Sequence, residues 1–121
     1  MGRTDEMVAR LRSLQAAHPG ITALAIVSSD GLSIASTLPG GNTEDRLSAM
    51  SAAMLALGDR VAEELGRGAF EQVLIGGEQG FVALMSMGEK AVLAAVADQH
   101  ARPGLVLLDM RRALEDLRQL M

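Results

Sequence analysis

Residues 47–58 read LSAMSAAMLALG, a run of Leu, Met, Ala and Ser that contains no charged residue. Leucine, methionine and alanine are strong helix formers, so this run is predicted to be helical. A helix at the surface of a globular protein normally carries charged residues on the side that faces water. Here charges return only in DRVAEELG, residues 59–66. The segment must therefore be covered on more than one side.

We expect a single helix from residue 44 to about residue 66, with Thr43 as its N-cap. At 100° per residue one apolar stripe forms, which we expect to cover the sheet of the same chain. Its members are Leu47, Met50, Met54, Leu57, Val61 and Leu65. The other positions up to residue 58 are small or apolar: Ser48, Ala49, Ser51, Ala52, Ala53, Leu55, Ala56 and Gly58. Such a surface is typical of an interface, although alanine and serine are also tolerated on exposed helix faces.

The segment before this helix predicts a helix and a β-hairpin. Thr4 is a suitable N-cap for a first helix, whose apolar stripe is Met7, Leu11 and Leu14 and which Pro19 and Gly20 end. Residues 21–37, ITALAIVSSDGLSIAST, are two β-like runs around an Asp-Gly pair. This dipeptide favours a tight type I′ turn, so we expect a two-stranded hairpin there.

The segment after the central helix predicts three strands and a last helix. The β-like runs are FEQVLIG (70–76), GFVALMSM (80–87) and KAVLAAVA (90–97), and the short loops between them indicate an antiparallel meander. The last helix has an apolar stripe at spacings of three and four. Its members are Leu107, Met110, Leu114, Leu117 and Met121.

The element order is thus αββαβββα, which describes an α+β sandwich of one antiparallel sheet and three helices. The 121 residues show no linker or repeat, so residues 1–121 are expected to form one domain. The net charge is -4, and two Phe are the only aromatic residues, which argues against nucleic acid as a partner. No signal peptide or membrane-spanning run is apparent, so we expect a cytoplasmic protein without membrane insertion.

The run QVLIGG, residues 72–77, begins the meander and is therefore expected at an edge of the sheet. It has no Pro, and Glu71 is the nearest charged residue before it, so it invites pairing with another strand. A two-fold operation can pair this strand with its own copy and pack the central helix against its own copy. The sequence therefore predicts a homodimer.

The ordered series ALAIVSSDGLSIASTLPGG, ALGDRVAEELGRGAFEQVLIGGEQG and VLAAV, followed by an amphipathic helix, resembles the Roadblock family of dynein light-chain-like domains. The resemblance is greatest to its bacterial MglB-like branch, which regulates small Ras-like GTPases. It implies a five-stranded antiparallel sheet with the central helix on one face and the terminal helices on the other. It also implies a homodimer formed through the central helix and the third strand.

The resemblance further implies two sets of contact residues. Contacts between the two copies would involve Ser51, Leu55, Gly58 and Ala62 in the helix and Gln72, Val73, Leu74 and Ile75 in the strand. The surface offered to a partner, expected to be a small Ras-like GTPase, would include Ser48, Ala52, Ala56, Asp59 and Glu63.

Residues with reactive side chains form no catalytic pattern, so we expect a protein that is not an enzyme and has no cofactor and no metal. His18 and His100 lack a metal-ligand spacing, and the sequence has no Cys. The loop GGEQG joins two strands instead of opening a helix, as a phosphate-binding loop would. Arg60 and Arg67 could be proposed as arginine fingers, but DRVAEELGR also fits ordinary helix charge pairing.

Three functions compete at this stage. The first is a non-enzymatic module that binds and regulates or scaffolds a small Ras-like GTPase. The second is a small-molecule sensor domain, which the shortage of aromatic residues disfavours because ligand pockets normally contain them. The third is a scaffold subunit of a larger complex that contains no GTPase.

Overall fold

The computed structural model describes residues 2–88 and 90–121 and contains three helices and five strands in these residues. Their order along the chain is αββαβββα, as the sequence predicts. The elements are α1 (Arg3–Ala17), β1 (Ile21–Ser28), β2 (Ser33–Ser36), α2 (Asn42–Glu64), β3 (Gln72–Gly77), β4 (Gly80–Ser86), β5 (Ala91–Asp98) and α3 (Pro103–Gln119).

The strands form one antiparallel sheet in the order β2-β1-β5-β4-β3. The last strand, β5, lies in the centre between β1 and β4, which buries its apolar run on both faces. The meander begins at an edge, because β3 has only β4 as a neighbour. The predicted position of QVLIGG at a sheet edge is therefore confirmed.

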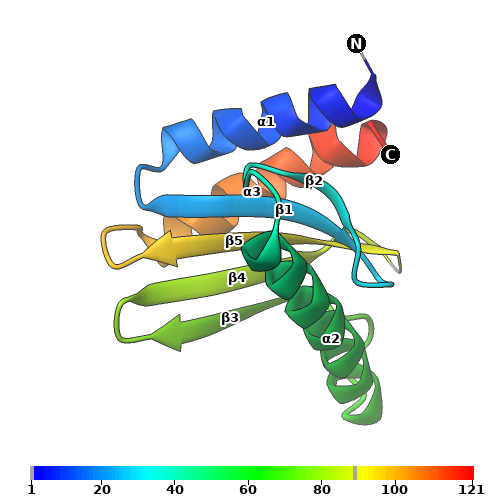
Figure 1. The fold of residues 1–121 in the computed structure, drawn as a ribbon. Coiled ribbons are helices and arrows are strands. Elements are labelled where there is room, and N and C mark those ends of the chain that lie inside the picture. Colours follow the sequence, from blue (N-terminus) through cyan, green and yellow to red (C-terminus); the bar gives the residue numbers. More distant parts are fainter. Residues whose placement is uncertain (1, 89) are drawn as a thin grey trace.

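The helices cover opposite faces of the sheet: α2 lies on one face and α1 and α3 lie on the other (Figure 1). The larger core lies under α1 and α3, where Leu11 and Met110 pack with Leu24 and Leu93 of the sheet. The smaller core lies under α2, where Leu55 packs with Val27 and Leu84. The predicted α+β sandwich is confirmed.

Two features of the helices position the surface described below. Ala25 and Ala94 belong to the core under α2, and their small side chains let the helix lie close to the strands. The C-terminal half of α2 extends past the sheet, so the chain itself offers less cover to this half (Figure 1). In the described residues no helix is apolar over a sufficient length to span a membrane.

The helix starts differ slightly from the predictions. The structure places the first helical residues at Arg3 and Asn42, with Gly2 and Gly41 in the N-cap positions, so Thr4 and Thr43 are not N-caps. In α3, Met110, Leu114 and Leu117 are buried as expected. Leu107 is only half-buried, and Met121 lies beyond the end of the helix and is exposed.

The turn between β1 and β2 is not the predicted type I′ turn. That turn requires positive φ at both central residues, but here Gly31 has a φ of 86° and no residue other than glycine among the described ones has positive φ. The structure has a longer loop instead. The Gly31 N–H donates to the Ser28 carbonyl at 3.0 Å, and the Ser28 N–H donates to the Leu32 carbonyl at 2.9 Å.

Candidate functional site

The exposed edge strand β3 is the first part of the candidate site. Leu74 is 40% exposed and Ile75 is 43% exposed, although both lie in a strand of apolar sequence. Val73 and Ile75 lie on the face of the sheet covered by α2, because their partners in β4 are Leu84 and Val82. Leu74 lies on the opposite face, since it pairs with Ala83 of the larger core. The edge therefore carries an exposed apolar side chain on each face.

The helix α2 is rotated relative to the prediction. The side chains that it buries against its own sheet are Leu47, Ser48, Ser51 and Leu55, and Gly58 and Ala62 continue the same face as half-buried residues. Ser51 and Leu55, which we expect to contact a second copy, are therefore buried against the sheet of their own chain. Ser48, which we expect on an outward partner surface, is buried on the same side of the helix.

The physical reason is the close approach of the helix to the chain beneath it. A Cβ atom added to Gly58 would lie 2.6 Å from the ring of Phe70. Only a small residue fits there, so the sheet-facing side of α2 is built from Ser and Gly as well as Leu. The hydroxyl of Ser48 is satisfied within the helix, where it donates to the Glu44 carbonyl at 2.8 Å.

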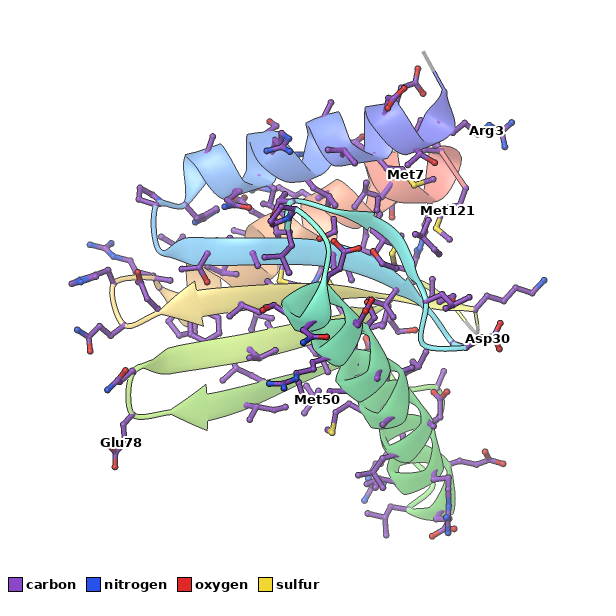
Figure 2. The ribbon with its side chains drawn as sticks, in the orientation of Figure 1. Arg3, Met7, Asp30, Met50, Glu78 and Met121 are labelled. Atoms are coloured by element: carbon purple, nitrogen blue, oxygen red, sulfur yellow. The ribbon has the colours of Figure 1, made fainter. Side chains whose placement is uncertain are left out.

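Of the stripe expected to cover the sheet, Leu47 is buried there and Met54 packs against the smaller core. The other four members instead form an exposed apolar flank of α2 and its C-cap. Met50 is 60% exposed, Leu57 52%, Val61 49% and Leu65 67%. We call these residues the apolar flank. Met50 projects from α2 on the side where β3 lies (Figure 2). Four large apolar side chains on one side of a helix form a surface that monomeric proteins rarely leave in water.

An open groove joins this flank to β3. It has a volume of about 440 Å³. Leu57 and Val61 line it from α2, and Phe70, just before β3, and Val73, within β3, line it from the other side. Its lining is mostly apolar, and Arg67 and Glu71 are the charged residues that line it. The apolar flank, the groove and the β3 edge therefore make one continuous surface.

The other expected partner residues lie away from β3. Ala56, Asp59 and Glu63 are exposed on α2, and Ala52 is half-buried beside the β1–β2 turn. A Cβ atom added to Gly31 in that turn would lie 3.8 Å from the Ala52 Cβ. At 100° per residue these positions lie roughly opposite the apolar flank. The helix thus presents an apolar side and an alanine-rich, acidic side.

The residues with reactive side chains take structural positions. His18 Nε2 lies 2.6 Å from Asp109 Oδ2 and links the end of α1 to α3. Arg60 pairs with Glu64 at 3.3 Å, one turn further along α2. The GGEQG segment forms the turn between β3 and β4. Among the residues that the structure describes, no group of three His, Asp or Glu side chains is arranged to hold a metal ion.

One contact of the site is not predicted by any pattern in the sequence. Arg111 Nη2 in α3 donates a hydrogen bond of 2.6 Å to Gln72 Oε1 in β3. It holds the side chain of Gln72 over the face of the sheet that carries α3. The two residues are 39 positions apart, and no local pattern pairs them.

This arrangement defines a class: a small α+β sandwich with a free apolar sheet edge and a partly uncovered helix beside it. The chain belongs to the family of Roadblock/LC7 domains, whose model matches residues 7–97. The uncharacterized protein MJ1340 of Methanocaldococcus jannaschii is 36% identical over 99 residues, which cover 82% of this chain and 86% of that protein.

Two solved structures show the same fold. One is described as MglB with a tetrameric arrangement and is 24% identical, with a TM-score of 0.88 over 99% of this chain and 90% of that chain. The other is the gliding protein MglB of Thermus thermophilus, also 24% identical, with a TM-score of 0.87 over 99% of this chain and 91% of that chain. The predicted relation to Roadblock domains is confirmed.

Proposed function

We propose that this chain is a non-enzymatic homodimeric module that binds a small Ras-like GTPase and regulates or scaffolds it. The observation that carries the proposal is the continuous surface of apolar flank, groove and β3 edge in a Roadblock domain. An edge strand with free backbone groups and a helix with exposed Met, Leu and Val beside it call for a partner. A second copy supplies both a strand and a helix.

In the proposed dimer the two β3 strands pair and the two α2 helices pack through Met50, Leu57, Val61 and Leu65. Gln72, Val73, Leu74 and Ile75 keep the role expected for them. Gly58 and Ala62 are half-buried and line the groove, so in the proposed dimer they contribute less to the contact than the apolar flank does. Ser51 and Leu55 support the helix from the side of the sheet.

The GTPase is proposed to dock on the outward side of the α2 pair, where Ala52, Ala56, Asp59 and Glu63 lie. The support for a GTPase partner is the resemblance to MglB-like regulators, together with the alanine-rich surface. Alanine side chains leave a shallow surface that a protruding segment of a partner can approach. Asp59 and Glu63 add negative charge at its rim, which mainly increases the rate of association.

Binding assays test this proposal. The small Ras-like GTPases of the organism that encodes the chain are purified, loaded with a GTP analogue or GDP, and titrated into the wild-type protein. At least one GTPase should bind in one nucleotide state. Absence of binding in both states for every GTPase would reject the proposal and leave a sensor domain or a scaffold without a GTPase as the alternatives.

A matched pair of variants tests the docking surface. Ala56→Arg places a bulky charged side chain on the exposed side of α2 and should abolish binding. Ala9→Arg makes the same change on the exposed surface of α1, on the other face of the sheet, and should bind as the wild type does. The reverse result would move the site to the α1 and α3 face.

A further inference from the structure

The β3 edge has backbone groups that point away from the sheet, and the pairing with β4 identifies them. The Ser86 N–H donates to the Glu71 carbonyl at 2.8 Å, so residue 71 bonds to β4. In an antiparallel pair, successive residues bond to alternate sides of the strand. Since Gln72 pairs with Met85 and Gly77 with Gly80, the outward N–H and C=O groups belong to Gln72, Leu74 and Gly76.

Only one antiparallel register of two β3 strands satisfies all of these groups. If Leu74 faces Leu74 of the second copy on the two-fold axis, Gln72 faces Gly76 and every outward group has a partner within β3. If the axis passes through Val73, Gly76 faces residue 70, which precedes the strand. If it passes through Ile75, Gln72 faces residue 78 in the turn.

The side chains favour the same register. On the face covered by α2, the central position of Leu74 brings Val73 opposite Ile75 in both halves of the pair. Branched apolar side chains that face each other across strands stabilise a sheet. Ile75 is 43% exposed in the single chain, so this contact gives it the cover that it lacks.

Gly76 supplies an independent argument. Glycine inside a strand costs stability and often marks a place where another chain comes close. Nothing in the single chain requires glycine here, because its φ is not positive and a Cβ atom would meet no atom within 4 Å. In the register centred on Leu74, Gly76 lies opposite Gln72 of the second copy, whose side chain Arg111 holds on the same face.

We propose that two copies pair through β3 with Leu74 on the two-fold axis, and that Gly76 makes room for the Gln72–Arg111 pair of the other copy. The proposal rests on the homodimer of the proposed function and fixes which residues meet in it. Gln72 and Gly76 then act as a matched pair on each side of the axis, which sets the register of the sheet.

Single cysteines test the register, because the chain has no native Cys. Residues directly opposite in a bonded pair have Cα atoms about 5.5 Å apart, within the span of a disulfide. Leu74→Cys should therefore form a cross-linked dimer on mild oxidation, read on a non-reducing gel. In Val73→Cys and in Ile75→Cys, the cysteines of the two copies lie diagonally across the strand pair, with their Cα atoms more than about 7 Å apart. These variants should therefore cross-link on the order of tenfold more slowly.

Light scattering on the wild-type protein, read together with the cross-linking rates, distinguishes a wrong register from a wrong interface and from the absence of a homodimer. A dimer in which Val73→Cys or Ile75→Cys cross-links fastest would overturn the register and leave the homodimer intact. A dimer in which none of the three variants cross-links would overturn pairing through β3. A wild-type mass near 12.7 kDa across the micromolar range would reject the homodimer itself.

A substitution at Gly76 tests the role of the glycine. Gly76→Val adds a side chain that meets nothing in its own chain and suits a strand better than glycine does. The variant should keep the far-UV circular dichroism spectrum and weaken dimerisation by at least about tenfold, because the new side chain fills the space of the facing Gln72. Equal or tighter dimerisation would place Gly76 away from the contact.

Discussion

Gly58 lies directly against Phe70: a Cβ atom at position 58 would be 2.6 Å from the Phe70 ring atoms Cδ1 and Cε1. The ring is buried between α2 and the sheet in the smaller core. This contact sets the distance of α2 from the strands. It also explains why the helix has a glycine in a position where glycine disfavours helix formation by about 1 kcal/mol.

Gly58→Ala should destabilise the protein despite the better helix propensity of alanine. Overpacking in a core costs about 1–3 kcal/mol. This cost equals or exceeds the gain of about 1 kcal/mol from replacing glycine by alanine in a helix. Gly104→Ala in α3 is the control, since a Cβ atom there meets nothing within 4 Å. Urea unfolding at one fixed protein concentration measures both variants. A Gly58→Ala variant that is more stable than the wild type would contradict this interpretation of the contact.

Leu57→Asp should give a folded protein that no longer dimerises. The side chain belongs to the apolar flank and is 52% exposed in the single chain, so the fold tolerates the charge. In the proposed helix pair the carboxylate loses water without gaining a partner, and the dimer Kd should rise on the order of 100-fold. Light scattering and circular dichroism measure mass and fold.

Two controls accompany Leu57→Asp. Leu32→Asp makes the same change at an exposed residue of the β1–β2 turn and should remain dimeric. Leu55→Asp places the charge in the chain's own core and should lower the free energy of unfolding by more than about 3 kcal/mol. If Leu57→Asp unfolds the chain and Leu55→Asp merely separates the copies, the rotation of α2 described above is incorrect.

His18→Ala should destabilise the link between α1 and α3. The ring lies 2.6 Å from Asp109 and its side chain is only 13% exposed, so a hydrogen bond to a charged group is lost, at a cost of about 1.5–3 kcal/mol. Arg112→Ala removes a longer, exposed contact to the same carboxylate and should cost less than about 1 kcal/mol. Thermal unfolding ranks the two variants, and an equal effect would argue against the His18 contact.

Gly80→Ala should disturb the sheet strongly. Gly80 has a φ of 144°, and a Cβ atom there would overlap the Ala97 carbonyl oxygen in β5. Both the backbone conformation and the contact must change, at a combined cost of about 2–5 kcal/mol. Gly66→Ala has positive φ but open space around it and should cost about 1–2 kcal/mol. Chemical unfolding measures both variants. A similar loss in the free energy of unfolding for the two would contradict the clash proposed between a side chain at position 80 and the Ala97 carbonyl oxygen.

The hairpin of β1 with β2 and the meander of β3, β4 and β5 could be predicted because β-like runs separated by short turns leave few alternatives. The sequence pattern does not specify the pairing of β5 with β1, which places β5 in the centre of the sheet. The position of β3 at an edge follows from the meander. The predicted type I′ turn at Asp30 and Gly31 is wrong, because the structure has a longer loop there with positive φ at the glycine alone.

The orientation of α2 could not be predicted from hydrophobicity. A stripe containing Met50, Leu57 and Val61 shows that something covers these residues, but the pattern is the same whether the cover is the chain's own sheet or another surface. The orientation of α2 depends on the contact with Phe70, because only a residue as small as Gly58 fits beside its ring. The side of α2 that carries Gly58 and the small residues therefore faces the sheet. This contact joins residues that only the folded chain brings together.

The free edge of β3 also bears on how a cell keeps related chains apart. Main-chain N–H and C=O groups are the same in every protein, so the hydrogen bonds of this edge do not distinguish a copy of the same chain from a paralogue with an equally free edge. Discrimination must come from the side chains beside the edge, such as Leu57 and Val61, and from the fit of Gln72 to glycine. An organism with several such domains could therefore form mixed pairs through a few substitutions at these positions, while the sheet remains unchanged.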